Sequence, residues 1–262
     1  MKRTSHYIDC RYGQLHYYKQ GREDGNVPLI CFHMSPYSGR YYEKFQADMS
    51  NDRIVICPDT PGYGGSDAPE QPASIEELTL AMAKLIEGLG FDQVDLLGFH
   101  TGVLIAAELA SIMPGRVRKL VLPGIPFVPA DKRSAIRTNY ETQRPYFEDE
   151  EFVATKWTEA VSSGKEGWSE ARKVEMFADV MRAGFKSNWG FMAVFDYDIE
   201  TKLAAIKNPV LLPVPDEMLS PSTRGAAALI SDATVNELPD VGADLFESCP
   251  AEFIGLVRKF LA

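Results

Sequence analysis

The stretch VDLLGFHTGVLIAAELA, residues Val94 to Ala110, decides the fold of this chain. It begins as an apolar run of strand length, breaks at Gly98 and Gly102, and resumes as an alanine-rich helical pattern. A strand, a tight glycine-flanked turn and a helix in this order lift one side chain above the end of a parallel sheet. The side chain raised in this way is that of His100.

Length and composition suit a single α/β domain that carries an insertion. The chain has 262 residues, of which 45% are hydrophobic, so it can bury a sizeable core. Its formal net charge of −10 argues against nucleic acid or an anionic membrane as a partner. No apolar run approaches a membrane span, and the four cysteines show no metal or redox spacing. We therefore expect a cytoplasmic protein with free thiols and no membrane segment.

Around the opening stretch, strand patterns alternate with helical ones. Besides the strand that begins at Val94, the predicted strands cover residues 5–10, 14–18, 27–32, 53–58, 117–122, 209–214 and 234–238. Ser74 and Glu77 form a capping box for one helix, and another closes the chain over residues 250–261. This alternation predicts a mostly parallel sheet covered on both faces, which binds ligands at the carboxyl ends of its strands.

Several loops at the predicted strand ends carry motifs typical of one family. The segments concerned are His33-Met34-Ser35-Pro36, Asp59 to Asp67, Gly98 to Gly102, Trp189 to Pro209, Leu238 to Gly242 and Pro250 to Phe253. In this order they resemble the H-G-x-P loop, the D-x-x-G-x-G-x-S-D turn, the nucleophile elbow, the end of a helical cap, and the closing strand, loop and helix of the α/β-hydrolase family. The resemblance covers nearly the whole chain.

The resemblance implies an α/β-hydrolase fold, with a mostly parallel central sheet flanked by helices and a helical cap. Residues 1–126 and 208–262 would form the core, and residues 127–207 the cap. The aromatic residues Trp189, Phe191 and Phe195 precede the return to the core, and we expect them to form a pocket wall. Such a wall predicts a small apolar or aromatic substrate. The sequence does not reveal the oligomeric state, and a homodimer is one possibility.

The chain departs from the family at the positions that carry the chemistry. His100 occupies the place of the nucleophile, and Ala243, with Asp244 beside it, occupies the slot of the family's catalytic histidine. A serine mechanism needs a hydroxyl with an adjacent base, so His100 and Ala243 cannot perform it.

The acid and the oxyanion loop of the family are also altered. Strict counting places Met218 at the acid's position, with Asp216 and Glu217 as neighbours. Met34 replaces the small glycine of the oxyanion loop. All three members of a Ser-His-acid triad are therefore absent from their expected places, and function must be argued from the site itself.

An imidazole on the exposed tip can act as a general acid or base near neutral pH. The backbone N–H groups of Ser35 and Thr101 would still face the same spot as an oxyanion hole, whatever side chain stands at His100. A base facing such a hole suits ester or lactone hydrolysis, or lyase or isomerase chemistry beside a carbonyl. The alternative is a decayed catalytic position at which the imidazole only fills space.

The other candidates have both a structural and a chemical interpretation. His33 braces its loop in the family, and a second catalytic histidine is the alternative. Asp216 either orients His100 or is a solvated loop charge. Two histidines alone do not make a metal site, and no cofactor is expected.

Three classes of function are compatible with these residues. The first is a small-molecule enzyme that uses His100, acting on a carbonyl-containing compound. The second is a ligand-binding pseudoenzyme that retains the pocket, and the third is a protein-partner role. The strained turn around His100 favours the first two, because a disused pocket has no need of it.

Overall fold

The computed structural model describes residues 1–23, 25–142, 150–163 and 167–262. Within these ranges, eight strands form one sheet in the order β1-β2-β4-β3-β5-β6-β7-β8. The strands are β1 (Thr4–Cys10), β2 (Gly13–Gln20), β3 (Asn26–Phe32), β4 (Arg53–Pro58), β5 (Val94–Gly98), β6 (Val117–Val121), β7 (Val210–Asp216) and β8 (Ala233–Gly242). β2 pairs antiparallel with β1 and β4, and all other pairs are parallel.

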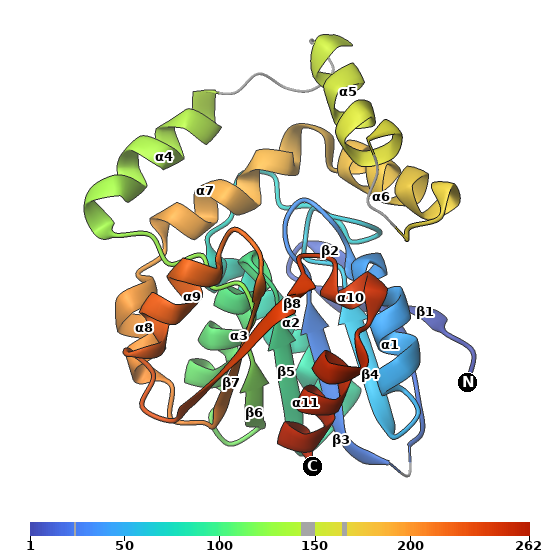
Figure 1. The fold of residues 1–262 in the computed structure, drawn as a ribbon, viewed down its shortest axis with the longest axis vertical. Coiled ribbons are helices and arrows are strands. Elements are labelled where there is room, and N and C mark those ends of the chain that lie inside the picture. Colours follow the sequence, from blue (N-terminus) through green and yellow to red (C-terminus); the bar gives the residue numbers. More distant parts are fainter. Residues whose placement is uncertain (24, 143–149, 164–166) are drawn as a thin grey trace.

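Helices cover both faces of this sheet (Figure 1). They are α1 (Glu43–Met49), α2 (Ile75–Leu89), α3 (Thr101–Ile112), α4 (Ala130–Thr142), α5 (Glu150–Trp157), α6 (Glu170–Ala183), α7 (Trp189–Asp196), α8 (Ile199–Ala205), α9 (Ser220–Ala227), α10 (Leu245–Ser248) and α11 (Ala251–Leu261), with the short η1 (Gly39–Tyr42), η3 (Thr158–Ser162) and η4 (Gly184–Asn188). The predicted fold class, a mostly parallel sheet between helices, is confirmed.

The sheet separates two apolar cores. In β4, Ile54 and Ile56 point to the side of α2, α3 and α8, whereas Val55 and Cys57 point to the side of α1 and α11. Successive side chains of a strand face opposite ways, so a strand buried on both faces reads as an uninterrupted apolar run. This explains why the central strands were recognisable in the sequence.

The predicted capping box of α2 is present. The Ser74 hydroxyl accepts the Glu77 N–H, the Glu77 carboxylate accepts the Ser74 N–H, and Gly90 ends the helix in the left-handed region.

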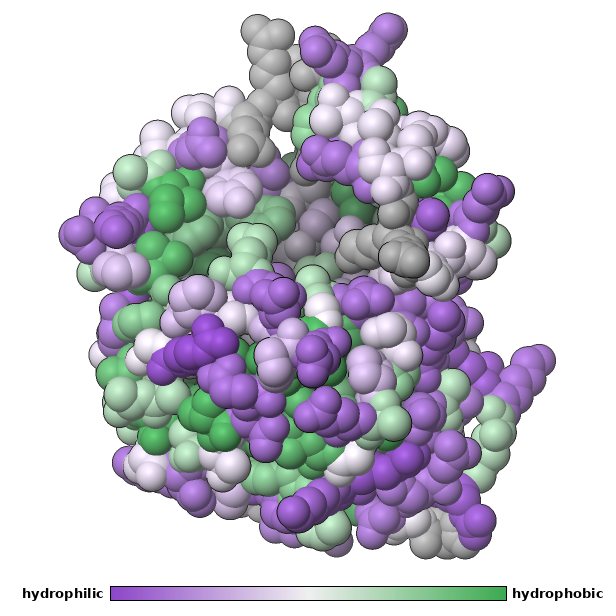
Figure 2. All heavy atoms as spheres, in the orientation of Figure 1, coloured by the Kyte–Doolittle hydropathy of each residue, from purple (hydrophilic) through white to green (hydrophobic). Residues whose placement is uncertain are grey.

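The helices between β6 and β7 separate into two groups. Helices α4 to α7, here called the helical layer, lie over the carboxyl ends of the strands, and α8 returns to the face of the sheet (Figure 1). The surface is hollowed between the helical layer and the sheet, with hydrophobic side chains along part of the wall (Figure 2). In the described ranges, no helix has the length and apolar character needed to span a membrane.

Candidate active site

The turn that carries His100 has the strained backbone that the glycine pattern predicts. β5 ends at Gly98 and α3 begins at Thr101, and His100 between them has φ 50° and ψ −114°. A Cβ at position 102 would lie 1.9 Å from the carbonyl oxygen of Phe32, so only glycine fits there. Strain of this kind costs about 1–3 kcal/mol and persists where the surrounding structure enforces it. The turn therefore holds the imidazole at the sheet end as predicted.

One edge of the His100 ring is packed against protein. Its Nε2 lies 3.3 Å from Oε2 of Glu217, whose side chain is only 1% exposed. The same edge faces Gly124, where a Cβ would lie 2.5 Å from Cδ2 of the ring. The His100 side chain is 22% exposed, so the imidazole still reaches the surface. With an N–H at Nε2 directed at the carboxylate, Nδ1 would be the nitrogen that keeps a lone pair.

The carboxylate against His100 belongs to Glu217, which corrects the expected pairing with Asp216. Asp216 is the last residue of β7, and its side chain points to solvent. Glu217 lies one residue beyond, in a turn closed by Ser220, whose hydroxyl accepts the Glu217 N–H at 3.2 Å. Met218, at the counted position of the acid, is 82% exposed.

The two residues expected to supply oxyanion amides lie together. The N–H of Ser35 donates to Oγ1 of Thr101 at 3.4 Å, and both residues are buried. Thr101 is the first residue of α3, and the first amides of a helix have no acceptor within the helix. The carbonyl of Met34 accepts from the Tyr37 N–H at 3.1 Å and closes the loop.

His33 has the environment of a bracing residue. Its Nδ1 donates to the Met34 carbonyl at 2.9 Å, and its Nε2 accepts the Thr60 N–H at 2.9 Å. Burial lowers the pKa of His33, and this outweighs the opposing effect of the Met34 carbonyl. A buried neutral imidazole with both nitrogens engaged fits the structural interpretation of His33.

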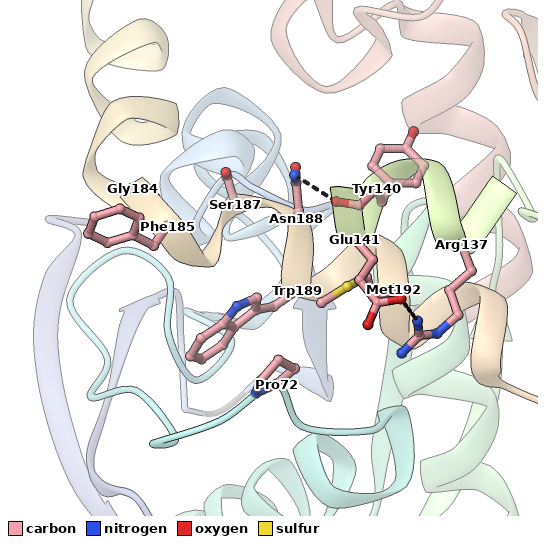
Figure 3. A pocket seen from close by; sticks show the side chains of 10 residues that line it. All are labelled: Pro72, Arg137, Tyr140, Glu141, Gly184, Phe185, Ser187, Asn188, Trp189 and Met192. Atoms are coloured by element: carbon pink, nitrogen blue, oxygen red, sulfur yellow. Dashed lines mark hydrogen bonds and ion pairs between the residues drawn. The ribbon is translucent and has the colours of Figure 1, made fainter. Parts of the chain in front are cut away.

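The three aromatic residues expected in one pocket wall separate into two groups. Trp189 lines a cavity of about 260 Å³ together with Met192 and Pro72 (Figure 3). Phe191 and Phe195 stack on Tyr140 of α4, with ring centroids 4.7 and 5.8 Å away. Residues 191 and 195 share one face of α7, and that face packs inside the helical layer.

The sequence did not single out Tyr63, which ties α7 to the core. Its hydroxyl accepts the Gly190 N–H at 2.8 Å and donates to the Lys186 carbonyl at 3.0 Å. A Cβ at position 190 would lie 2.0 Å from Oγ of Ser35, so α7 presses directly on the oxyanion loop. The position of Tyr63 inside the Asp59–Asp67 turn was the available signal. Among the described residues, no group of three or more His, Cys, Asp or Glu side chains is arranged to hold a metal ion.

This elbow above a mostly parallel sheet defines the class of protein. Residues 27–172, more than half of the chain, match the family model of the alpha/beta hydrolase fold. The chain therefore belongs to the alpha/beta hydrolase family, as the motifs predicted.

The chain is also similar in sequence to a curated hydrolase. Epoxide hydrolase 1 from Caenorhabditis elegans is 29% identical over 79% of this chain and 51% of its own length. The chain thus spans about half the length of this curated relative, and less of others that it matches.

Solved structures share the fold at low identity. A hydrolase from Pseudomonas aeruginosa PA01 is 20% identical, with a TM-score of 0.80 over 98% of both chains. The enol-lactonase from Burkholderia xenovorans LB400 is 21% identical, with a TM-score of 0.75 over 97% of this chain and 99% of its own.

Proposed function

We propose that this protein is an enzyme of the alpha/beta hydrolase fold that uses His100 as a general acid and base in place of a Ser-His-Asp triad. The observation that carries the proposal is the contact of His100 with the buried carboxylate of Glu217 on the strained elbow. A carboxylate in this position fixes the orientation of an imidazole and stabilises its protonated form. Positioned acid–base groups of this kind contribute roughly 10²- to 10⁴-fold to a rate.

Hydrolysis of an ester or lactone is the reaction that this arrangement suits best. Nδ1 of His100 removes a proton from water as the water oxygen bonds to the carbonyl carbon, and the carbonyl electron pair moves onto oxygen. The N–H groups of Ser35 and Thr101 would bind that oxyanion. When the carbonyl re-forms, the C–O bond to the leaving alkoxide breaks and the imidazolium returns the proton to it. Proton abstraction beside a carbonyl, in a lyase or isomerase reaction, would use the same two groups.

The substrate we propose is a small apolar or aromatic carbonyl compound. The helical layer supports this, since residues 127–207 would act as a cap over a core of residues 1–126 and 208–262. Trp189 and Met192 add apolar surface to the 260 Å³ cavity, whose lining residues do not include His100, and Arg137 in the same lining is already paired with Asp196 and Glu141. The enol-lactonase among the structural neighbours favours lactones as the first compounds to test.

A ligand-binding pseudoenzyme is the second candidate. The observation in its favour is that the Ser35 N–H already has an acceptor in Oγ1 of Thr101, which an oxyanion would have to displace. Such a protein would bind the same compounds through the hollow below the helical layer and release them unchanged.

A substrate screen separates the two candidates. Phenyl acetate, γ-butyrolactone, an enol lactone and a β-dicarbonyl are offered to the wild type, to His100→Ala and to the control His6→Ala, which alters a histidine of the edge strand β1. We expect turnover by the wild type and the control, and a loss of about 10²- to 10⁴-fold in His100→Ala. Equal turnover by all three would remove His100 from the mechanism. Binding without turnover would favour the pseudoenzyme.

Location and assembly complete the proposal. We propose a cytoplasmic protein, because its four cysteines are free thiols, as expected in a reducing compartment. A homodimer stays a prediction, which analytical ultracentrifugation would test.

A further inference from the structure

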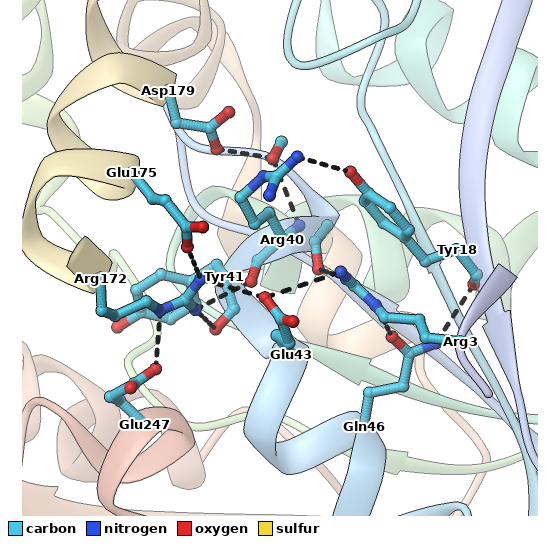
Figure 4. Close-up of polar contacts among 12 residues, drawn as sticks. Arg3, Tyr18, Arg40, Tyr41, Glu43, Gln46, Arg172, Glu175, Asp179 and Glu247 are labelled. Carbon is cyan, nitrogen blue, oxygen red and sulfur yellow. Dashed lines mark hydrogen bonds and ion pairs between the residues drawn. The ribbon is translucent and has the colours of Figure 1, made fainter. Parts of the chain in front are cut away.

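One face of α6 carries two buried polar side chains that reach down to the core. Arg172 and Asp179 are two helical turns apart, and Met176 between them is also buried. Figure 4 shows Arg172 and Asp179 pointing from this helix toward the segment that contains Arg40 and Tyr41. Buried charges of this kind need specific partners, because an unpaired one is strongly destabilising.

Arg172 binds the backbone of η1. Its Nη2 donates to the carbonyl oxygens of Arg40 at 2.9 Å and Tyr41 at 3.4 Å, and its Nε donates to Glu247 at 2.9 Å. Nη1 of Arg172 also lies 3.4 Å from carboxylate oxygens of both Glu43 and Glu175. The Arg40 carbonyl also accepts the Glu43 N–H at the end of η1, so Arg172 adds a second, charged donor to this oxygen.

Asp179 holds the other end of the same segment. Its Oδ2 accepts the hydroxyl hydrogen of Ser38 at 2.5 Å, and both side chains are buried. Oγ of Ser38 in turn accepts the Arg40 N–H at 3.2 Å and so caps η1. α6 therefore contacts residues 38–41 at both ends, through Asp179 at Ser38 and through Arg172 at the carbonyls of Arg40 and Tyr41.

Arg3, which immediately precedes β1, contacts the same segment from another side. Arg3 donates from Nη2 to the Gly39 carbonyl at 3.1 Å and from Nε to Gln46 at 2.6 Å. Its guanidinium lies 3.5 Å from the centre of the Tyr18 ring (Figure 4). Contacts with Arg3 on one side and with α6 on the other therefore hold η1 in one position.

Residues 38–41 follow directly on the oxyanion loop. Ser35 is three residues before Ser38, and the Tyr37 N–H is bonded to the Met34 carbonyl. A shift of η1 would therefore move the amide of Ser35 relative to Thr101. We infer that Arg172 and Asp179 are positioning residues, through which α6 sets the oxyanion loop of residues 33–36 for reaction. This inference rests on the proposed function of Ser35 as an oxyanion donor.

Hydrogen exchange tests the inference without requiring a substrate. Amide exchange of residues 33–43 is measured by mass spectrometry in the wild type, Asp179→Ala, Asp179→Asn and Glu170→Gln. Glu170 is exposed on the first turn of the same helix and serves as the control. We expect about tenfold faster exchange in Asp179→Ala, because a buried hydrogen bond is lost. Asp179→Asn should exchange at nearly the wild-type rate, since its amide oxygen still accepts from Ser38, and so should Glu170→Gln.

A second variant and a kinetic readout complete the test. Ser38→Ala removes only the hydroxyl group, and it should reproduce the faster exchange even where Asp179→Ala fails to fold. With an ester that the wild type hydrolyses, both alanine variants should lower kcat by about tenfold and leave KM within about twofold.

The outcomes for the positioning role and for the proposed function are distinct. Wild-type exchange of residues 33–43 in both alanine variants would overturn the positioning role and leave the His100 proposal untouched. Equal turnover by His100→Ala would overturn the proposed function, whereas the exchange result would still show whether α6 fixes the loop.

Discussion

The imidazole of His100 and the carboxylate of Glu217 meet at the carboxyl end of the sheet, 3.3 Å apart and 117 residues apart in the chain. The contact spans one intervening strand, because β6 lies between β5 and β7. The family resemblance places a histidine on the last loop to face the acid, but that position is Ala243. Here the imidazole comes from the elbow itself, and a glutamate reaches it directly.

Glu217→Gln tests the importance of the negative charge in this pair. The substitution keeps the size of the side chain and removes the charge that stabilises a protonated His100. We expect kcat on the best ester or lactone to fall by roughly 10- to 100-fold. The matched control is Asp216→Asn, which alters the exposed neighbour and should keep the wild-type kcat. A larger loss of kcat in Asp216→Asn than in Glu217→Gln would instead show that Asp216 orients His100.

Gly124→Ala tests whether the ring needs the space beside it. Gly124 has φ +68°, and a Cβ there would lie 2.9 Å from Nε2 of His100. The variant should be less stable to urea by about 1–3 kcal/mol and should lose activity as the ring moves away from Glu217. Gly255→Ala, on the exposed face of α11 with open space around it, should instead gain up to about 1 kcal/mol. Unchanged kcat in Gly124→Ala would contradict the packed position of the ring.

The sequence predicted the scaffold because the scaffold depends on short-range patterns. Apolar runs identified strands such as β4, and Ser74 with Glu77 identified the start of α2. The glycines around His100 predicted the elbow, since a side chain at Gly98 or Gly102 would collide with neighbouring backbone.

The site was harder to predict because it depends on which way side chains turn. Counting residues after β7 could not decide between Asp216 and Glu217, since the choice depends on where the strand ends. Similarly, Phe191 stacks on Tyr140 whereas Trp189 lines a cavity, and the sequence does not show which of these two roles each aromatic residue takes. The contacts of Arg172 and Asp179 with η1 join segments more than 130 residues apart, and no local pattern announces them.

His33 should make the folded protein sensitive to mild acid. Burial lowers its pKa, so the folded state resists the proton that the unfolded chain accepts near pH 6.5. The contribution of neutral His33 to stability is therefore fully present above that pH and is lost as the pH falls below it. His33→Gln, which retains an acceptor for the Thr60 N–H, should be less stable at pH 8 and lose less on going to pH 5. Urea unfolding of both proteins at each pH measures this difference, and parallel pH curves would contradict it.

The comparison with a variant is needed because neighbouring carboxylates also titrate. Burial raises the pKa of Asp179, so its own contribution to stability increases as the pH falls. The buried carboxylate of Asp59 is hydrogen bonded by His16 and by the Gly65 N–H, and its pKa is lowered. Its contribution to stability therefore decreases as the pH falls. The difference between wild type and His33→Gln reports the imidazole together with its electrostatic interaction with these two carboxylates.

A fluorophosphonate probe should leave the protein unlabelled. Such probes need an activated serine, and the elbow presents an imidazole instead. Ser35, the serine of the oxyanion loop, has its hydroxyl pressed against the backbone of α7 at Gly190. Mass spectrometry of the intact protein checks this, with a serine esterase labelled in parallel. Stoichiometric addition at any serine would contradict the account of the elbow.

Chemical rescue of His100→Ala by free imidazole tests the central claim most directly, because it returns the missing acid–base group without the rest of the side chain. The measurement is kcat/KM on the best ester or lactone as imidazole is raised, for the wild type and the variant. We predict that the variant starts roughly 10²- to 10⁴-fold below the wild type and regains activity with rising imidazole, whereas the wild type does not respond. Undiminished turnover by His100→Ala before any imidazole is added would contradict the claim.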